Sequence, residues 1–99
     1  MIKGLAHITG GGLIDNLPRI LPKNCDAVIE TKSWHGPRIF KILQQNGDVD
    51  PVEMYQVFNM GIGMVAVVSK RHAKGVSSIL RAKQIGRIER GTGKTRFLF

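Results

Sequence analysis

Three consecutive glycines, Gly10, Gly11 and Gly12, are the residues of this 99-residue chain best suited to bind an anion. Glycine lacks a Cβ atom, so its backbone adopts left-handed dihedral angles and lets a ligand approach closely. The amides of a helix that follows such a loop favour negative charge. His7 and Thr9, just before the glycines, add an imidazole and a hydroxyl. We therefore expect this loop to bind a phosphate group, although a flexible turn between two elements explains the same glycines.

Neither the dinucleotide fingerprint nor the Walker loop fits this triplet, because both need glycines that are spaced apart. The segment at residues 91–95, Gly-Thr-Gly-Lys-Thr, comes closer to a Walker loop. However, Ile88 stands where that pattern requires its first glycine, and the following residues predict a strand instead of the required helix. We expect residues 91–93 to form a solvent-exposed hairpin turn.

The order of apolar and polar residues predicts the elements that position these loops. Alternation over residues 3–9 predicts a strand that leads directly into the glycine loop. Pro18 has no amide hydrogen, so the apolar residues after the loop predict one short helical turn and a second that starts at Pro18. Further strands are predicted at residues 27–31, 60–68, 82–90 and 95–99, and helices at residues 37–47, 51–57 and 73–81.

Three of these predictions concern how the elements pack. Residues 60–68 are almost wholly apolar, which predicts a central strand covered on both faces. The last two strands are expected to pair as an antiparallel hairpin. The helix that starts at Pro37 carries an apolar stripe of Ile39, Phe40, Ile42 and Leu43. Together the elements predict an α+β fold, with a mixed sheet and helices packed on it.

The composition describes a small basic chain. It holds 15 Lys and Arg against 7 Asp and Glu, a formal net charge of +8, and residues 70–96 carry nine of these cations against one acid, Glu89. Its length suits a single domain with a modest core. No apolar run approaches the roughly 18 residues that cross a bilayer, and no secretory signal is recognisable. We expect a soluble, cytoplasmic protein whose basic run is a solvated face, with phosphorylated-ligand or nucleic-acid contact as the alternative.

No metal or redox site is expected. Cys25 is the one cysteine, which excludes an internal disulfide, and His7, His35 and His72 lack the spacing of metal ligands. His7 is the one candidate for a catalytic residue. An imidazole beside the glycine loop can hydrogen-bond a phosphate or transfer a proton near neutral pH. A structural histidine explains it equally well.

Three blocks of sequence resemble one enzyme family. The first, residues 6–22, reads AHITGGG and then NLPRILP. The second, residues 33–44, holds Ser-Trp, then Pro-Arg-Ile-Phe and Leu-Gln. The third, residues 53–64, holds Glu-Met-Tyr and then Phe-Asn-Met-Gly-Ile-Gly-Met. In this order they are similar to the aminoimidazole ribonucleotide synthetases, the phosphoribosylformylglycinamidine cyclo-ligases of purine synthesis.

The resemblance implies an ATP-dependent ligase that closes an imidazole ring. In that family ATP phosphorylates the formamide oxygen of formylglycinamidine ribonucleotide, an amidine nitrogen attacks, and phosphate leaves to give aminoimidazole ribonucleotide. The resemblance also implies that a first domain handles ATP and Mg²⁺ and that the second is an α/β sandwich partly related to the ferredoxin-like fold. Residues 1–99 are then an incomplete carboxy-terminal domain that is inactive alone and needs the missing domain or a companion chain.

The resemblance covers a further glycine-bearing segment at residues 59–63. Two glycines at the start of a buried strand let another backbone or a ligand approach, and the Asn59 amide offers both donor and acceptor. We therefore expect Asn59 and Gly61, with Thr9, Gly10, Gly11 and Gly12, to contact a ribonucleotide substrate. Packing explains the glycines of this segment as well.

Two other functions remain open. The charge of +8 fits a basic RNA-binding module, although the strand at residues 60–68 lacks the exposed aromatics of RNA-recognition sheets. A structural interaction module that forms a homo-oligomer, and so covers apolar surface left by missing strands, is the third hypothesis.

Overall fold

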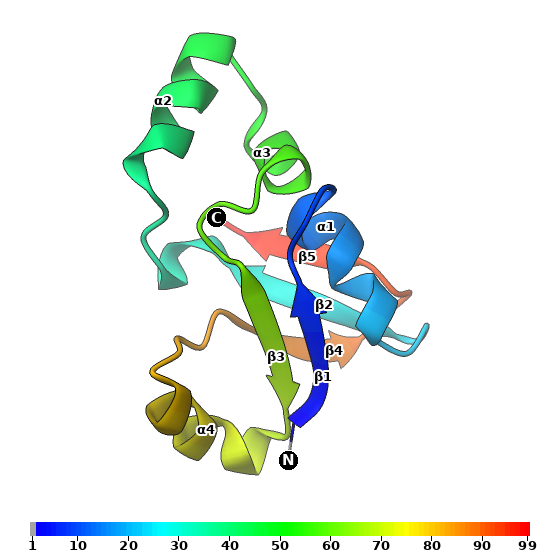
Figure 1. The fold of residues 1–99 in the computed structure, drawn as a ribbon. Coiled ribbons are helices and arrows are strands. Elements are labelled where there is room, and N and C mark those ends of the chain that lie inside the picture. Colours follow the sequence, from blue (N-terminus) through cyan, green and yellow to red (C-terminus); the bar gives the residue numbers. More distant parts are fainter. Residues whose placement is uncertain (1) are drawn as a thin grey trace.

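The chain folds into five strands and four helices (Figure 1), described here by a computed structural model for residues 2–99. The strands are β1 (Ile2–His7), β2 (Cys25–Glu30), β3 (Met64–Val68), β4 (Gly86–Arg90) and β5 (Thr95–Leu98). The helices are α1 (Gly12–Asn16), α2 (Arg38–Gly47), α3 (Pro51–Val57) and α4 (Ala73–Leu80). Short 3₁₀ turns lie at η1 (Pro18–Ile20), η2 (Thr31–Ser33) and η3 (Lys70–His72). None of the helices within residues 2–99 is long and apolar enough to cross a membrane.

The strands form two sheets instead of one. β1 pairs with β3 in an antiparallel two-stranded sheet, and the second sheet has the order β4-β2-β5. β4 is antiparallel to β2 while β5 is parallel to it, so the mixed α+β prediction is confirmed. The predicted hairpin between the last two strands is wrong, because β4 and β5 lie on opposite sides of β2. The reason is the apolar run of β2, whose Ala27, Val28 and Ile29 are at most 3% exposed and take the centre of the sheet.

The prediction of a central strand at residues 60–68 is also wrong. Positive φ angles at Met60 (55°) and Gly61 (90°) turn the chain there, so β3 begins only at Met64. Among the strands of the described residues, 2–99, β3 pairs with β1 alone, and its residues are half-buried or exposed. An apolar run indicates burial without indicating which strand is central, and here β2 is the buried strand.

The helices follow the sequence more closely. α1 ends at Asn16 and Pro18 starts η1, as its missing amide predicts. Pro37 precedes α2 as its N-cap. The predicted apolar stripe of α2 is present but largely uncovered, since Ile39, Ile42 and Leu43 remain 40–52% exposed. Figure 1 shows why: α2 projects away from both sheets.

The core lies between α1, α3 and the β2 sheet. Leu13 and Met54 are fully buried there, and Tyr55 stacks against Phe97 of β5 with ring centroids 4.8 Å apart. Trp34 is buried beside Tyr55, and its indole N–H donates a hydrogen bond to the carbonyl oxygen of Met60 at 3.0 Å. The core therefore fixes α1, and with it the glycine loop that precedes α1, against the sheet.

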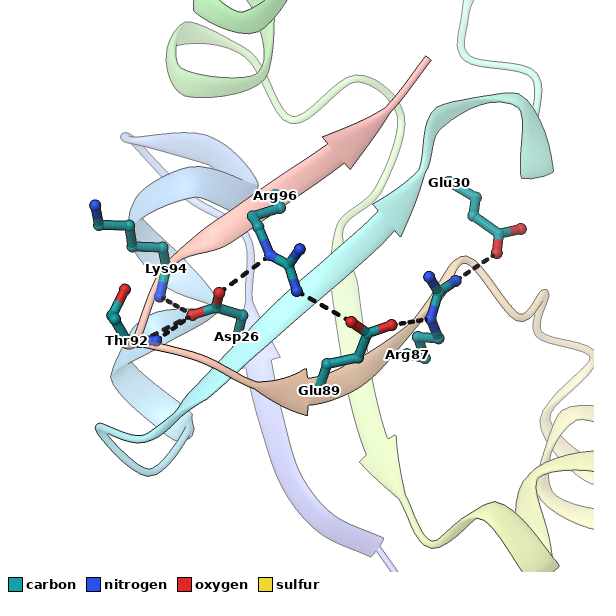
Figure 2. Close-up of polar contacts among 8 residues, drawn as sticks. Asp26, Glu30, Arg87, Glu89, Thr92, Lys94 and Arg96 are labelled. Atoms are coloured by element: carbon teal, nitrogen blue, oxygen red, sulfur yellow. Dashed lines mark hydrogen bonds and ion pairs between the residues drawn. The ribbon is translucent and has the colours of Figure 1, made fainter.

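The loop between β4 and β5 closes around one carboxylate (Figure 2). Oδ1 of Asp26 accepts hydrogen bonds from the backbone amides of Thr92, Gly93 and Lys94 at 2.8, 2.9 and 2.8 Å. Oδ2 pairs with Nε of Arg96 at 3.0 Å. The Walker-like segment is thus an anion-binding loop whose anion is a side chain of the protein itself.

Ion pairs extend from this loop across the sheet. Figure 2 shows Arg96 bound also to Glu89, Glu89 to Arg87, and Arg87 to Glu30. These pairs link β5, β4 and β2 through side chains that are about 40–54% exposed. Part of the positive charge of the carboxy-terminal run is therefore neutralised within the sheet.

Replacement of Leu13 by Ala should destabilise the fold by about 2–5 kcal/mol, because it removes buried methyl groups and leaves a cavity. Ile79→Ala is the matched control, since Ile79 is 79% exposed and should change the free energy of unfolding by less than about 0.5 kcal/mol. Urea denaturation followed by Trp34 fluorescence measures both. Equal effects of the two substitutions would contradict this description of the core.

Acid should weaken the Asp26 loop. The amide of Lys94, then those of Thr92 and Gly93, and the charge of Arg96 lower the pKa of Asp26 below its usual 3.8, against the opposing effect of burial. A carboxyl whose pKa is lower in the folded state stabilises fully above its unfolded pKa, and this stability is lost as the pH falls through the folded pKa. Asp26→Asn should lower the urea midpoint at pH 7. It should also make the midpoint fall less steeply as the pH drops below about 5. Asp48→Asn, at an exposed carboxyl, is the control and should leave the midpoint and its pH dependence unchanged. An unchanged acid profile in Asp26→Asn would exclude this role.

Candidate functional site

The glycine loop leaves β1 and turns into α1 with two residues in left-handed backbone conformations. Gly11 has a φ of 94° and Gly12 a φ of 62°. The amide of Gly12 donates to the carbonyl oxygen of Thr9 at 3.0 Å. Within residues 2–99, no backbone or side-chain acceptor takes the amides of Gly10 and Gly11, and Gly10 is exposed with open space around it. Two loop amides are thus available to a ligand.

α1 contributes less to anion binding than the sequence predicts. It is five residues long, which is little more than one turn, and Asp15 lies in its first turn. A short helix with an acid at its start offers little positive potential. Any anion at this site would therefore be bound mainly by the amides of the loop.

Asn16 holds the loop in shape, and the sequence analysis missed it. Its side chain is 5% exposed and donates to the carbonyl oxygen of Gly12 at 2.6 Å and, more weakly, to that of Gly10 at 3.4 Å. Its Oδ1 accepts a hydrogen bond from the Thr9 hydroxyl at 3.1 Å. The available signal was a lone polar residue between Leu13 and Leu17 on the buried side of α1, because a buried amide needs partners nearby.

Packing accounts for Gly12. A Cβ atom at this position would overlap the carbonyl oxygen of Tyr55 and lie 2.9 Å from that of Phe58. Only glycine lets α1 approach the end of α3 this closely while keeping a positive φ. Gly12 therefore positions the loop, and its amide is already used by Thr9.

An open pocket of about 250 Å³ lies beside the loop. Thr9, Gly10 and Asn59 supply its polar wall, and its apolar wall consists of Ile8, Phe40, Val57 and Phe58. The structure thus brings together three of the predicted site residues from two distant segments. None of these seven residues carries a charge, and the Thr9 hydroxyl already donates its proton to Asn16, so this pocket offers hydrogen bonds from the Asn59 side-chain amide and the Gly10 backbone amide.

The other predicted site residues lie outside this pocket. His7 is exposed at the end of β1, opposite Met64 of β3. Gly61 donates its amide to Oδ1 of Asn59 at 2.8 Å, and a Cβ atom there would come 2.5 Å from Cδ of Pro37. Its positive φ and this close approach explain the glycine, and the hydrogen bond fixes the turn that carries Asn59.

The described residues offer binding groups without a self-contained catalytic apparatus. Within residues 2–99 no three His, Cys, Asp or Glu side chains come together in a group that could hold a metal ion. Mg²⁺ prefers carboxylate and other oxygen ligands, so the residues of this site do not fit a magnesium centre. The pocket can orient an oxyanion through hydrogen bonds.

The contrast between adjacent glycines gives a test of this geometry. Gly12→Ala should destabilise the fold by roughly 2–4 kcal/mol, because a left-handed alanine costs about 1–2 kcal/mol and the overlap with Tyr55 adds to it. Gly10→Ala, at a position with open space, should stay within about 0.5 kcal/mol. Urea denaturation compares the two. A tolerated alanine at Gly12 would show that α1 and α3 do not approach as described.

Comparison with known proteins gives one family over nearly the whole chain. Residues 1–98 match the family described as AIR synthase related protein, C-terminal domain. This agrees with the resemblance carried by residues 6–64 and with the α+β fold.

Two curated relatives carry the name phosphoribosylformylglycinamidine cyclo-ligase. The protein of Syntrophus aciditrophicus (strain SB) is 48% identical in an alignment 98 residues long, which covers 94% of this chain and 28% of that protein. The protein of Chromobacterium violaceum is 52% identical over 80 residues, which are 81% of this chain and 23% of that protein. The chain thus spans about a quarter of the length of these relatives. It belongs to the AIR synthase related proteins, within their C-terminal domain family.

Proposed function

We propose that this chain is the carboxy-terminal part of an ATP-dependent cyclo-ligase that converts formylglycinamidine ribonucleotide to aminoimidazole ribonucleotide in purine biosynthesis. The names of both curated relatives support this activity. A cytoplasmic location is part of the proposal, because it fits a biosynthetic role of this kind. The observation that carries the proposal is the pocket in which Thr9, Gly10 and Asn59 meet, because these residues come from two of the three matching sequence blocks.

The pocket would hold a phosphate group of the reaction. The amides of Gly10 and Gly11 would donate hydrogen bonds to its oxygens. The Thr9 hydroxyl donates its proton to Asn16, and this contact keeps the loop in place. Such donors stabilise negative charge without reorganising during the reaction. The phosphate is either the 5′-phosphate of the ribonucleotide or the one that leaves during ring closure. Asn59 would orient the substrate through its amide, and Gly61 would hold Asn59.

Other groups of the reaction would come from outside the pocket. His7 is the candidate for proton transfer, from its exposed position before the loop. ATP supplies the phosphoryl group that activates the formamide oxygen, and Mg²⁺ accompanies ATP. Both would be bound by polypeptide beyond these 99 residues, either an amino-terminal domain or a companion chain. A homo-oligomer is the other way to complete the protein.

The RNA-binding alternative receives less support. Arg87 and Arg96 of the basic run are paired with Glu89, Glu30 and Asp26. β3 consists of Met and aliphatic residues, so it offers no aromatic side chain on which a base could stack. The cyclo-ligase names of the relatives favour the enzyme.

The purified chain alone should neither hydrolyse ATP nor produce aminoimidazole ribonucleotide. Residues 2–99 bring together no three His, Cys, Asp or Glu side chains that could hold Mg²⁺. The family resemblance assigns ATP to a first domain, which these residues do not span. Incubation with ATP, Mg²⁺ and formylglycinamidine ribonucleotide, followed by a colorimetric assay of the product, measures this. The full-length Syntrophus relative serves as the positive control, and product formation above background by the 99-residue chain would refute the prediction.

Inorganic phosphate should bind at the glycine loop and not at the loop of residues 91–94. The Gly10 and Gly11 amides are available, whereas those of Thr92, Gly93 and Lys94 are held by Asp26. A phosphate titration followed by amide ¹H–¹⁵N spectra should therefore shift the first two signals and leave the other three in place. Sodium chloride at matched ionic strength is the control. Equal shifts in both loops, or none at Gly10 and Gly11, would remove the support for a phosphate site.

A further inference from the structure

A large open groove lies between the β1-β3 pair and the β4-β2-β5 sheet. Its volume is about 1400 Å³, and its lining includes residues of β3, of α4 and the chain that follows it, and of β4. Lys3 of β1, Leu17 and Ile20 near α1, and Ala27 and Ile29 of β2 line it as well. In Figure 1, α4 stands apart from the β4-β2-β5 sheet and is joined to β4 by an extended connection. Val76 is the one residue of α4 that is buried. The groove is therefore a region in which the elements of the fold are not closely packed.

The groove is lined mainly by apolar side chains that are poorly covered. Met64, Leu80 and Ile88 are 59%, 54% and 40% exposed. Val65, Val67 and Val68 of β3 line it as well and are only half-buried. A continuous apolar surface of this kind marks a site of contact with another polypeptide.

Two strand edges are unpaired at the groove. Among the strands of residues 2–99, β3 pairs with β1 alone and β4 with β2 alone, so each keeps one free edge. Both strands contribute lining residues to the groove. A free edge presents a row of backbone donors and acceptors to which an added strand can bind. The groove thus offers backbone hydrogen bonds as well as apolar contact.

The charges around the groove identify the chemistry of its occupant. Lys3, Lys70, Lys74, Lys83 and Arg87 are among its lining residues, and no acidic residue is. The salt bridges within residues 2–99 include Arg87 and none of these four lysines. A second copy of the chain would bring the same lysines and a further charge of +8 to the contact. An apolar segment flanked by Asp or Glu fits better.

We propose that the groove binds a strand-forming segment with apolar residues facing inward and carboxylates facing the lysines, supplied by the part of the cyclo-ligase that these 99 residues do not span. This rests on the proposed function. The relatives contain enough further chain to supply such a segment, because the matched residues make up only 28% and 23% of their lengths. It would add a strand to the edge of β3 and fill the space between β3, α4 and β4.

The test co-expresses the tagged chain with the part of the Syntrophus relative that lies outside its 98 matched residues, so that the two polypeptides fold together. We expect the untagged polypeptide to copurify in a one-to-one complex, as measured by light scattering. Leu80→Asp, at a 54% exposed groove residue, should lower the copurified amount about tenfold, which corresponds to about 1.4 kcal/mol. Ile39→Asp is the matched control, because Ile39 is 52% exposed on α2 and does not line the groove.

Charge reversal separates the acidic partner from a purely apolar one. The double variant Lys74→Glu with Lys83→Glu should lose the complex at low salt and regain part of it at high salt, whereas Lys41→Glu on α2 should bind normally. The absence of a wild-type complex, or equal effects of Leu80→Asp and Ile39→Asp, would overturn the proposal. So would self-association of the chain alone that Leu80→Asp abolishes, since it would assign the groove to a second copy.

The readout does not depend on catalysis. A complex that forms through the groove but makes no aminoimidazole ribonucleotide would refute the proposed function and leave the interface standing. An active mixture that is insensitive to Leu80→Asp would do the reverse.

Discussion

The buried carboxylate of Asp26 is the constraint on which the arrangement of the remaining chain depends. By holding the amides of residues 92–94, it fixes the loop that crosses the start of β2, and β5 pairs with β2 on the far side from β4. β5 then brings Phe97 against Tyr55 and the Thr95 hydroxyl within 3.3 Å of the carbonyl oxygens of Leu13 and Ile14. These contacts hold α1, and α1 carries the glycine loop. A single ionised side chain near the start of the central strand β2 therefore helps to position a pocket that lies on another element.

The two glycine-rich loops show how similar local chemistry serves different purposes. Both use residues with positive φ to expose backbone amides, at Gly11 and Gly12 in one loop and at Gly93 in the other. The second is closed by Asp26, so its donors stabilise the fold. The first keeps the amides of Gly10 and Gly11 free because Asn16 binds the carbonyl oxygens of the loop and the Thr9 hydroxyl, and none of the backbone amides. The two loops therefore differ in whether the protein supplies its own anion to the backbone amides.

Local features of the fold could be predicted from the sequence, whereas the pairing of strands could not. Alternation gave β1, and Pro18 gave the break after α1, because both depend on neighbouring residues alone. The position of β5 depends on Asp26, which lies 66 residues before Thr92, and no pattern within residues 91–99 encodes that contact. The site behaves in the same way. Thr9, Gly10 and Asn59 do meet, but the sequence could not distinguish the glycines required by packing, Gly12 and Gly61, from the one that remains open.

The apolar groove and the glycine loop are connected through the β1-β3 strand pair. β1 and β3 form a two-stranded sheet, and such a pair is only marginally stable without a third strand or a covering element. β1 leads directly into Thr9 and Gly10, so any fraying of this pair moves the donors of the pocket. A segment that adds a strand to β3 would stabilise β1 as well. The loop would then lose less conformational entropy when phosphate binds. Binding at the groove and binding at the loop should therefore favour each other, because each ligand orders a strand pair that the other also needs. A partner polypeptide in the groove would thus do more than supply missing groups, because it would also stabilise the strands that carry the groups already present.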